Sequence, residues 1–221
     1  PTLAKLTSKK DSLGRTWYYK WCSRGNLTKE TDPAGGEITY TYDSYNNRTS
    51  RKDQKGRKTQ YFYDQTGSRL LKVIDAAGGI SSFTYDSRGN LATSSDQLGR
   101  KTSFEYDVLN RLTKTIYPDG RYTAVEYDEA GNVALRRDNL NRETRCEYTQ
   151  SGRVSKVIRP DGSNISYVYD AKDRKISETA PSGNVTGFVY DGLNHLIETR
   201  YPDGSSESFS YDTEGRLISR R

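Results

Sequence analysis

The chain has 221 residues, of which 32% are hydrophobic and 29% are charged, and its formal net charge is +6. The apolar share lies below the roughly 45–50% of ordinary globular domains, which argues against one large packed core. Its 35 basic and 29 acidic residues interleave along the whole length without a basic run or arm. The positive charge therefore does not indicate a nucleic-acid partner.

The termini and the cysteines give further limits. No stretch approaches the ~20 consecutive apolar residues of a membrane span, and no amino-terminal apolar segment resembles a signal peptide. The chain opens at Pro1 without an initiator Met, so we expect a piece of a longer polypeptide. Cys22 and Cys146 form no CxxC pair, and they predict neither a metal site nor a disulfide framework. No cofactor and no metal are expected.

A tyrosine recurs every 21 residues through most of the chain, with one step of 22 residues where Ser68 is extra. A fixed period of this size is typical of repeat proteins, whose units are too small to bury a core alone. We therefore predict one domain over residues 1–221, an array of about ten repeats. The recurring positions are Trp21, Tyr42, Tyr63, Tyr85, Tyr106, Tyr127, Tyr148, Tyr169, Tyr190 and Tyr211.

Each repeat opens with a predicted strand. Phe83 and Tyr85 flank Thr84, which is the alternation of a half-buried strand, and most other repeats keep this pattern. One face of the strand is predicted to be an aromatic row and the other mostly polar. The pattern does not say which face points inward, because three apolar residues interrupt the polar positions: Phe62, Val168 and Val189.

A tight turn follows the strand. In eight of ten repeats the residue after the tyrosine is aspartate, whose carboxylate can accept a backbone N–H two residues on. Eight copies favour a structural role over a catalytic one. These aspartates are Asp43, Asp64, Asp86, Asp107, Asp128, Asp170, Asp191 and Asp212. Four residues after the aromatic position stands a residue that tolerates positive φ, namely Gly25, Asn46, Gly67, Gly89, Asn110, Gly131, Gly152, Asp173, Asn194 or Gly215.

An apolar residue such as Leu91 or Leu217 then opens a second strand, and a second turn closes the repeat. This second turn carries Gly35, Gly56, Gly78, Gly99, Gly120, Gly162, Gly183 or Gly204, with Asn141 as the substitute. Each repeat thus reads strand, turn, strand, turn, with no room for a helix.

Ten such repeats give about twenty short strands in one antiparallel meander. At roughly 4.8 Å per strand the ladder would extend on the order of 95 Å. Twisted open sheets rarely exceed about ten strands without curling, and about eight strands already fill a barrel with side chains. We therefore predict an all-β repeat fold in which the sheet coils into a hollow spiral or barrel wall.

The repeated motif Tyr-Asp-x-x-Gly-Asn/Arg-Leu, seen at Tyr85–Leu91 and Tyr211–Leu217, resembles the YD repeat of the Rhs proteins. Tc toxin C components, bacterial wall-associated proteins and teneurins share this repeat, and the resemblance covers residues 6–221. It implies a hollow cocoon that, in bacterial members, holds a carboxy-terminal toxin until delivery. The implied partners are the rest of the same polypeptide and its cargo, with secretion-system components and cell-surface glycans as further candidates. The implied location is secreted or extracellular.

The chain departs from the family pattern in two respects, the autoprotease segment and a plug or capping element, so we expect part of a shell wall. Rhs shells usually end in an Asp-Pro-x-Gly-type autoprotease segment, whereas Asp32-Pro33 belongs to an ordinary repeat turn. The first functional hypothesis is a container wall for a toxin or other polypeptide. The alternative is an extracellular adhesion or carbohydrate-binding module that uses the aromatic row, although cross-strand aromatic pairs also explain that row.

An enzyme is not expected, and no catalytic residue is predicted. The sequence has no Ser-His-Asp set, no metal-ligand spacing and no phosphate-binding loop. His195 is the only histidine, and it occupies a turn position where other repeats carry Asn or Arg.

Overall fold

The computed structural model describes residues 5–221, and these form 21 β-strands of one antiparallel sheet and no helix. The chain divides into two units. The first unit is Pro1–Arg111 with Ile116–Gly120, and the second is Leu112–Thr115 with Arg121–Arg221. Strand β11 (Leu112–Ile116) is divided between the two.

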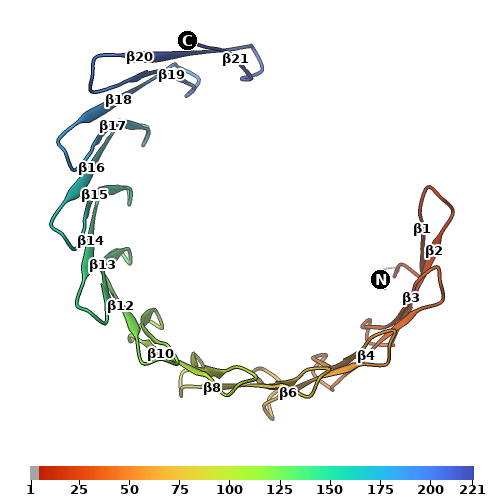
Figure 1. Ribbon diagram of the computed structural model, residues 1–221. Coiled ribbons are helices and arrows are strands. Elements are labelled where there is room, and N and C mark those ends of the chain that lie inside the picture. The colour runs from red at the N-terminus through yellow and green to blue at the C-terminus, as the bar shows by residue number, and fades with distance from the viewer. Residues whose placement is uncertain (1–4) are drawn as a thin grey trace. The chain divides into compact units, whose positions relative to one another are not determined.

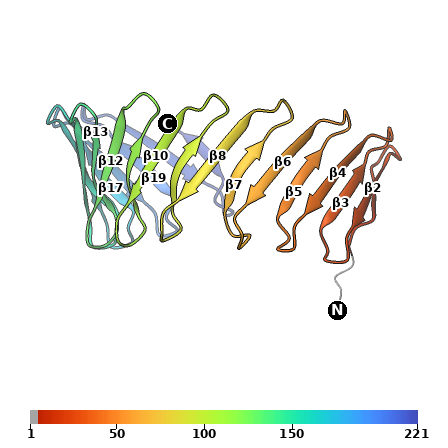
Figure 2. The ribbon, with the colours of Figure 1, turned by 90° about the horizontal axis from the view of Figure 1, so that it is seen from below.

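In the first unit every strand is antiparallel to its neighbours in the chain, and the strands lie side by side in one tilted row (Figures 1 and 2). The strands are β1 (Ser8–Lys10), β2 (Thr16–Trp21), β3 (Leu27–Thr31), β4 (Glu37–Tyr42), β5 (Arg48–Lys52), β6 (Lys58–Tyr63), β7 (Leu70–Ile74), β8 (Ile80–Tyr85), β9 (Leu91–Ser95) and β10 (Lys101–Tyr106).

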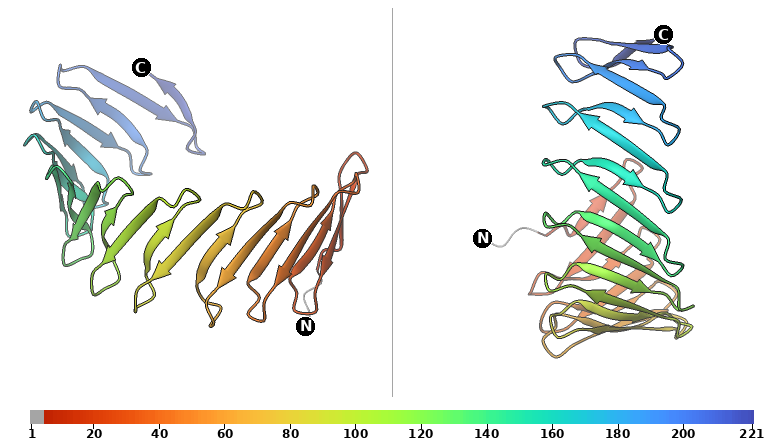
Figure 3. Two further views of the ribbon diagram at one scale, coloured as in Figure 1. Left: turned by 60° about the horizontal axis from the view of Figure 1, so that its bottom comes forward. Right: turned by 90° about the vertical axis from the view of Figure 1, so that its left-hand side faces the viewer.

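The second unit repeats this pairing, and the right-hand view of Figure 3 shows its strands from green to blue. The strands are β12 (Tyr122–Tyr127), β13 (Val133–Asp138), β14 (Glu143–Tyr148), β15 (Val154–Ile158), β16 (Asn164–Tyr169), β17 (Lys175–Thr179), β18 (Val185–Tyr190), β19 (Leu196–Arg200), β20 (Ser206–Tyr211) and β21 (Leu217–Arg220).

The sheet of each unit is a single layer, so side chains on both faces keep contact with solvent. Among residues 5–221, Leu135 is the only apolar side chain that is buried, with 4% of its surface exposed. Most strand side chains are half-buried against their neighbours in the sheet. This accounts for the low apolar share, because a one-layer sheet needs no thick core.

The strand registers define two faces. In the pair β4–β5, Tyr40 lies opposite Arg51 on one side, and Thr41 lies opposite Ser50 on the other. We call the side with the recurring tyrosines and the residues two positions before them the aromatic face. The opposite side, which carries the residues between them, is the polar face. Near Tyr42 the register shifts by one residue, a β-bulge that recurs in both units at the same point of the repeat.

Both turns of a repeat have the same backbone geometry. In the second turn between β3 and β4, the Gly35 N–H donates to the Asp32 carbonyl at 3.0 Å, and the Asp32 N–H donates to the Gly36 carbonyl at 2.9 Å. The residue at the Gly35 position must adopt positive φ, as in three-residue hairpin loops. Asn and Asp replace Gly there at five positions with φ between 56° and 72°: Asn46, Asn110, Asn141, Asp173 and Asn194. The predicted all-β repeat fold of short antiparallel strands is confirmed.

Candidate functional site

The recurring aspartates form the turns through their carboxylates. Asp86 Oδ1 accepts the backbone N–H groups of Arg88 at 2.9 Å and Asn90 at 2.8 Å. The same two bonds, from residues two and four positions on, form at the other turn of the repeat, where Asp96 Oδ1 accepts from Leu98 and Arg100. The carboxylate therefore satisfies two backbone donors that the three-residue loop leaves unpaired.

The second carboxylate oxygen binds the side chain four positions on. In seven turns this side chain is arginine, whose Nε donates to Oδ2 at 2.6 to 2.7 Å: Arg15, Arg57, Arg100, Arg111, Arg142, Arg174 and Arg216. The arginine hydrogen bond is the main reason that the pKa values of Asp96, Asp138 and Asp170 lie below the usual range for aspartate. These carboxylates are consequently ionised at neutral pH, and both oxygens of each already accept hydrogen bonds within the turn.

The recurring tyrosines connect one repeat to the next. The hydroxyl of Tyr169 donates to the carbonyl of Val154, 15 residues earlier, at 2.9 Å. Seven further tyrosines make this bond at 2.8 to 3.3 Å: Tyr42, Tyr63, Tyr85, Tyr127, Tyr148, Tyr190 and Tyr211. Trp21 makes the equivalent bond from its indole N–H to the Leu6 carbonyl at 2.9 Å. The acceptor in each tyrosine pair opens the second strand of the preceding repeat.

Burial raises the pKa of the phenols at Tyr42, Tyr63, Tyr106 and Tyr148 above the usual value. These hydroxyls therefore stay protonated at neutral pH, and those of Tyr42, Tyr63 and Tyr148 act as donors. Sequence reasoning did not identify this bond, but one signal was present. The position two residues earlier varies among Tyr, Phe, Val and Cys, whereas the recurring position always carries a ring with a polar hydrogen.

Two second turns carry glycine where other turns have arginine. Gly36 and Gly79 stand four residues after Asp32 and Asp75. A Cβ on Gly36 would lie 2.6 Å from Cδ of Gln54, and one on Gly79 would lie 2.8 Å from Cδ of Gln97. Gln54, in the turn of the following repeat, donates from Nε2 to Asp32 Oδ2 at 2.6 Å. The glycine thus makes room for a glutamine that replaces the missing arginine.

His195 and the two tryptophans belong to the same repeat scaffold. His195 stands where other turns have Arg, its Nδ1 lies 3.0 Å from Asp191 Oδ2, and its ring stacks on Tyr211 with 4.6 Å between centroids. Trp17 lies beside Arg15, 5.9 Å from the guanidinium carbon to the ring centroid. None of these contacts brings a hydroxyl or thiol nucleophile beside the imidazole, and its carboxylate neighbour is the turn residue Asp191.

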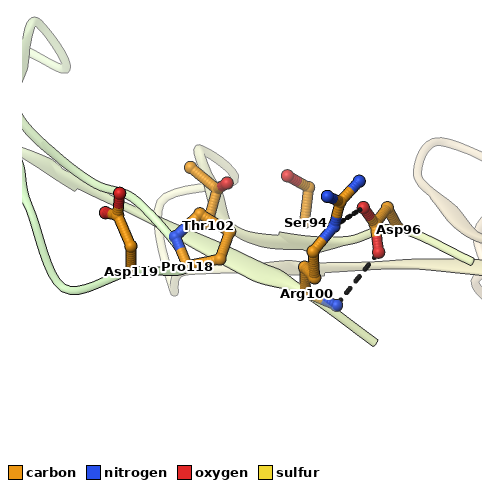
Figure 4. Close-up of a pocket in the computed structure, with 6 residues that line it drawn as sticks. All are labelled: Ser94, Asp96, Arg100, Thr102, Pro118 and Asp119. Atoms are coloured by element: carbon orange, nitrogen blue, oxygen red, sulfur yellow. Dashed lines mark hydrogen bonds and ion pairs between the residues drawn. The ribbon is translucent and has the colours of Figure 1, made fainter. Parts of the chain in front are cut away.

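Shallow hollows recur between consecutive second turns. The hollow in Figure 4 has a volume of about 360 Å³ and is lined by Ser94, Asp96, Arg100, Thr102, Pro118 and Asp119. Its arginine is already bonded to Asp96 through both dashed contacts of the figure. Similar hollows of about 440 and 280 Å³ lie beside Gln54 and beside Pro160. Recurrence at the same place of the repeat indicates that they follow from turn spacing.

Residues 5–221 contain no group of three His, Cys, Asp or Glu side chains able to hold a metal ion. Over that part of the chain there is likewise no helix of the length and apolarity needed to cross a membrane. Cys22 and Cys146 are both free thiols. The predicted motif residues thus recur as one set, in which the aspartates hydrogen-bond within the turns and the tyrosines hydrogen-bond to the preceding repeat.

Comparison with known proteins agrees with this scaffold. Residues 65–221 match the family described as Teneurin YD-shell, and residues 23–58 match the family described as RHS Repeat. This chain belongs to the Teneurin YD-shell family. The resemblance to YD-repeat proteins drawn from the motif is therefore confirmed, and the YD-shell family is a structural one. No curated protein matches the sequence.

Solved structures show the YD-shell fold in longer chains. The crystal structure of TcdB2-TccC3 matches with a TM-score of 0.55 at 15% identity, over 97% of this chain and 15% of that chain. TcdB2-TccC3-TEV matches with a TM-score of 0.55 at 16% identity, over 94% of this chain and 14% of that chain. The form without the hypervariable C-terminal region gives 0.54 at 16% identity, over 97% and 14%. The likeness shows the fold, and this YD-shell chain spans about one seventh of the length of those chains.

Proposed function

We propose that this chain is a segment of the wall of a larger hollow β-shell, which encloses a polypeptide cargo before delivery to a target cell. The observation that carries the proposal is the YD-shell match over residues 65–221. Support also comes from the length relation, because the chain covers only 14 to 15% of the TcdB2-TccC3 chains that share its fold. The partners in this proposal are the remaining shell and a toxin or other cargo, and the location is outside the producing cell.

In this proposal the motif residues have a structural role. The aspartates hold each turn in one conformation, and the tyrosines bond each repeat to the one before it. A wall one layer thick has no second layer to support it, so its rigidity depends on these repeated bonds. The whole chain acts as one array of about ten repeats over residues 1–221.

The adhesion or carbohydrate-binding alternative has less support. Sugar binding by aromatic residues generally combines a ring face with polar groups that are free to bond. On the aromatic face the hydroxyls of eight recurring tyrosines already donate to backbone carbonyls. Their rings are half-buried against neighbouring strands.

The decisive experiment is cryo-electron microscopy of the full-length polypeptide that contains this chain. We expect a closed hollow particle with weak internal density. A particle filled by ordered protein, or an open extended sheet, would contradict the proposal. The images can be paired with limited proteolysis, in which enclosed cargo should resist cleavage.

Substitutions in the wall test whether the wall itself protects the cargo from proteolysis. Replacing Tyr148, Tyr169 and Tyr190 together by Ala should loosen the wall and make the cargo cleavable, because three inter-repeat bonds are lost. Tyr167→Phe is the matched control, since other repeats carry Phe at that position, as at Phe188. Cargo that is digested equally in wild type and in both variants would mean that the wall encloses nothing.

A further inference from the structure

The lysines of the first unit gather on one face of the sheet, although they are scattered in the sequence. The registers place seven lysines on the polar face of β1–β10: Lys10, Lys20, Lys29, Lys52, Lys58, Lys72 and Lys101. The acidic residues on that face are Glu37 and Glu105. The strand arginines of this unit, Arg48 and Arg51, lie on the aromatic face. We call the seven residues the lysine face.

Five positions of this face form a continuous row across five strands. Lys20 lies opposite Lys29, Lys29 opposite Thr39, Thr39 opposite Lys52, and Lys52 opposite Lys58. Neighbouring strands are roughly 4.8 Å apart, so the backbone positions of the four lysines lie along one line of about 19 Å. Lys29 pairs with Glu37, while Lys20, Lys52 and Lys58 are exposed.

The row does not serve the stability of the sheet. Like charges placed directly opposite each other across two strands are destabilising. At the equivalent position of β13–β14 in the second unit, Arg137 lies opposite Glu143, an ion pair with 2.8 Å from Nε to Oε1. The same register position therefore accepts opposite charges, whereas the β5–β6 pair has two cations there.

The neighbouring register position gives the same contrast. Where β2 and β3 place Lys20 opposite Lys29, β8 and β9 place Thr84 opposite Thr93, with 2.6 Å between hydroxyl oxygens. In β20 and β21 Ser210 lies opposite Ser219 at 2.7 Å. The repeat can fill this position with a bonded pair, so the lysine pair needs another explanation.

We infer that the lysine face binds an extended polypeptide segment rich in Asp and Glu. Carboxylates spaced along such a segment would lie between the ammonium groups and relieve the repulsion along the row. A polypeptide fits better than a nucleic acid, because nucleic-acid sites favour arginine for its bidentate contacts to phosphate and the face has none. The choice of a polypeptide also rests on the proposed function, in which the wall meets cargo.

The test is fluorescence anisotropy of the full chain with a labelled polyglutamate peptide, at low salt of about 50 mM and at physiological salt. Polyaspartate should behave similarly, and labelled single-stranded DNA is the competing polyanion. We expect polyglutamate to bind and the affinity to fall as salt rises. The triple variant Lys20→Gln, Lys52→Gln, Lys58→Gln should weaken binding about tenfold, since exposed charge pairs contribute modestly each.

The matched control removes the same charge elsewhere. Lys9 lies on the aromatic face, and Lys55 and Lys172 stand at turn tips, so the triple variant Lys9→Gln, Lys55→Gln, Lys172→Gln keeps the lysine face. It should bind polyglutamate like wild type. The face variant should also unfold at a temperature no lower than wild type, because it removes like-charge repulsion. An unfolding temperature equal to or above that of wild type would show that weaker binding is not caused by unfolding.

Three results would overturn the inference: no polyglutamate binding at low salt, an equal loss in both triple variants, or tighter binding of DNA with the same dependence on the lysine face. An equal loss in both triple variants would mean that binding depends only on the net charge of the chain. The experiment is separate from the imaging of the full-length protein. An open or filled particle would remove the container function and leave a measured polyglutamate site in place.

Discussion

At the scale of the residue, the recurring aromatic position is defined by its polar hydrogen more than by its ring. Every recurring tyrosine except Tyr106 has a described hydroxyl bond to a carbonyl in the repeat before it. The side chain two residues earlier also lies on the aromatic face, but that position carries Phe, Val or Cys in some repeats. The polar hydrogen, from a hydroxyl or from the indole N–H of Trp21, is thus the common feature of this position.

The first prediction follows from this difference. Tyr169→Phe removes the bond to the Val154 carbonyl, which is 2.9 Å long, and keeps the ring. We expect the free energy of unfolding to fall by about 1 kcal/mol, because a half-buried carbonyl loses its partner. Tyr167→Phe, two residues away on the same face, should change it by less than half as much. Urea denaturation followed by circular dichroism measures both, and equal effects would show that the bond carries no stability.

Residue patterns explain how much of the site could be predicted. The positive-φ residues and the turn aspartates could be read from the sequence because the constraint is local, within four residues of the chain. The tyrosine bond could not, since its acceptor is a backbone carbonyl 15 residues away and carbonyls leave no trace in the sequence. The Gln54 contact to Asp32 was missed for a related reason, because it joins turns of two repeats.

At the scale of the element, each turn is held by an ionised carboxylate, so acid should loosen many turns together. The pKa values of Asp96, Asp138 and Asp170 are lowered in the folded chain, mainly by arginine hydrogen bonds. A lowered folded pKa gives stability that is fully present above the ordinary value of about 3.9 and is lost as the pH falls through the folded pKa. The urea midpoint should therefore stay constant from neutral pH to about pH 5 and decline below about pH 4. Asp138→Asn should show a smaller decline, and a midpoint that does not change in acid would contradict this account.

The glycine turns allow a sharper test of how neighbouring turns cooperate. Gly36→Arg alone would supply the arginine common to other turns, but it would displace the Gln54 side chain from Asp32. Gln54→Ala alone removes the hydrogen bond. The double variant has arginine four residues after Asp32 and a short residue in place of Gln54. The natural turn of Asp53 and Arg57 has the same combination, because the residue equivalent to Gln54 in the following repeat is Ala76.

We therefore expect the double variant to be more stable than the sum of the two single changes predicts, by about 1 kcal/mol, as for residues in direct contact. Urea denaturation of the four proteins gives the coupling energy. Gly36 has no positive φ, so arginine at this position meets no backbone strain. A coupling energy near zero would show that the glycine and the glutamine are independent.

At the scale of the whole molecule, the two faces of the sheet differ in ways that the linear sequence hides. Arg51 and Lys52 are adjacent in the chain, yet they lie on opposite faces because strand side chains alternate. The interleaved charges therefore gave no sign of the lysine face. The all-β array could be predicted because the 21-residue period is global, whereas the charge of one face depends on register at each strand pair.

The repeat organisation predicts which deletions the chain tolerates. Deleting residues 149–169, one full period within the second unit, joins Tyr148 to Asp170 and so restores the Tyr-Asp order of the motif. Tyr148 keeps its bond to Val133 and Tyr190 keeps its bond to Lys175, while Tyr169 is removed together with its acceptor Val154. No retained tyrosine loses its partner.

Deleting only residues 149–158 removes a turn and β15, so β16 would have to run in the opposite direction and Tyr169 would lose its acceptor. We expect the longer deletion to keep a β-type circular dichroism spectrum, a single peak in size-exclusion chromatography and cooperative unfolding at somewhat lower stability, as a one-dimensional array loses one repeat. The shorter deletion should aggregate or unfold although it removes fewer residues. If both deletions behaved alike, stability would not depend on whole repeats, and an array of equivalent units would be the wrong description of this chain.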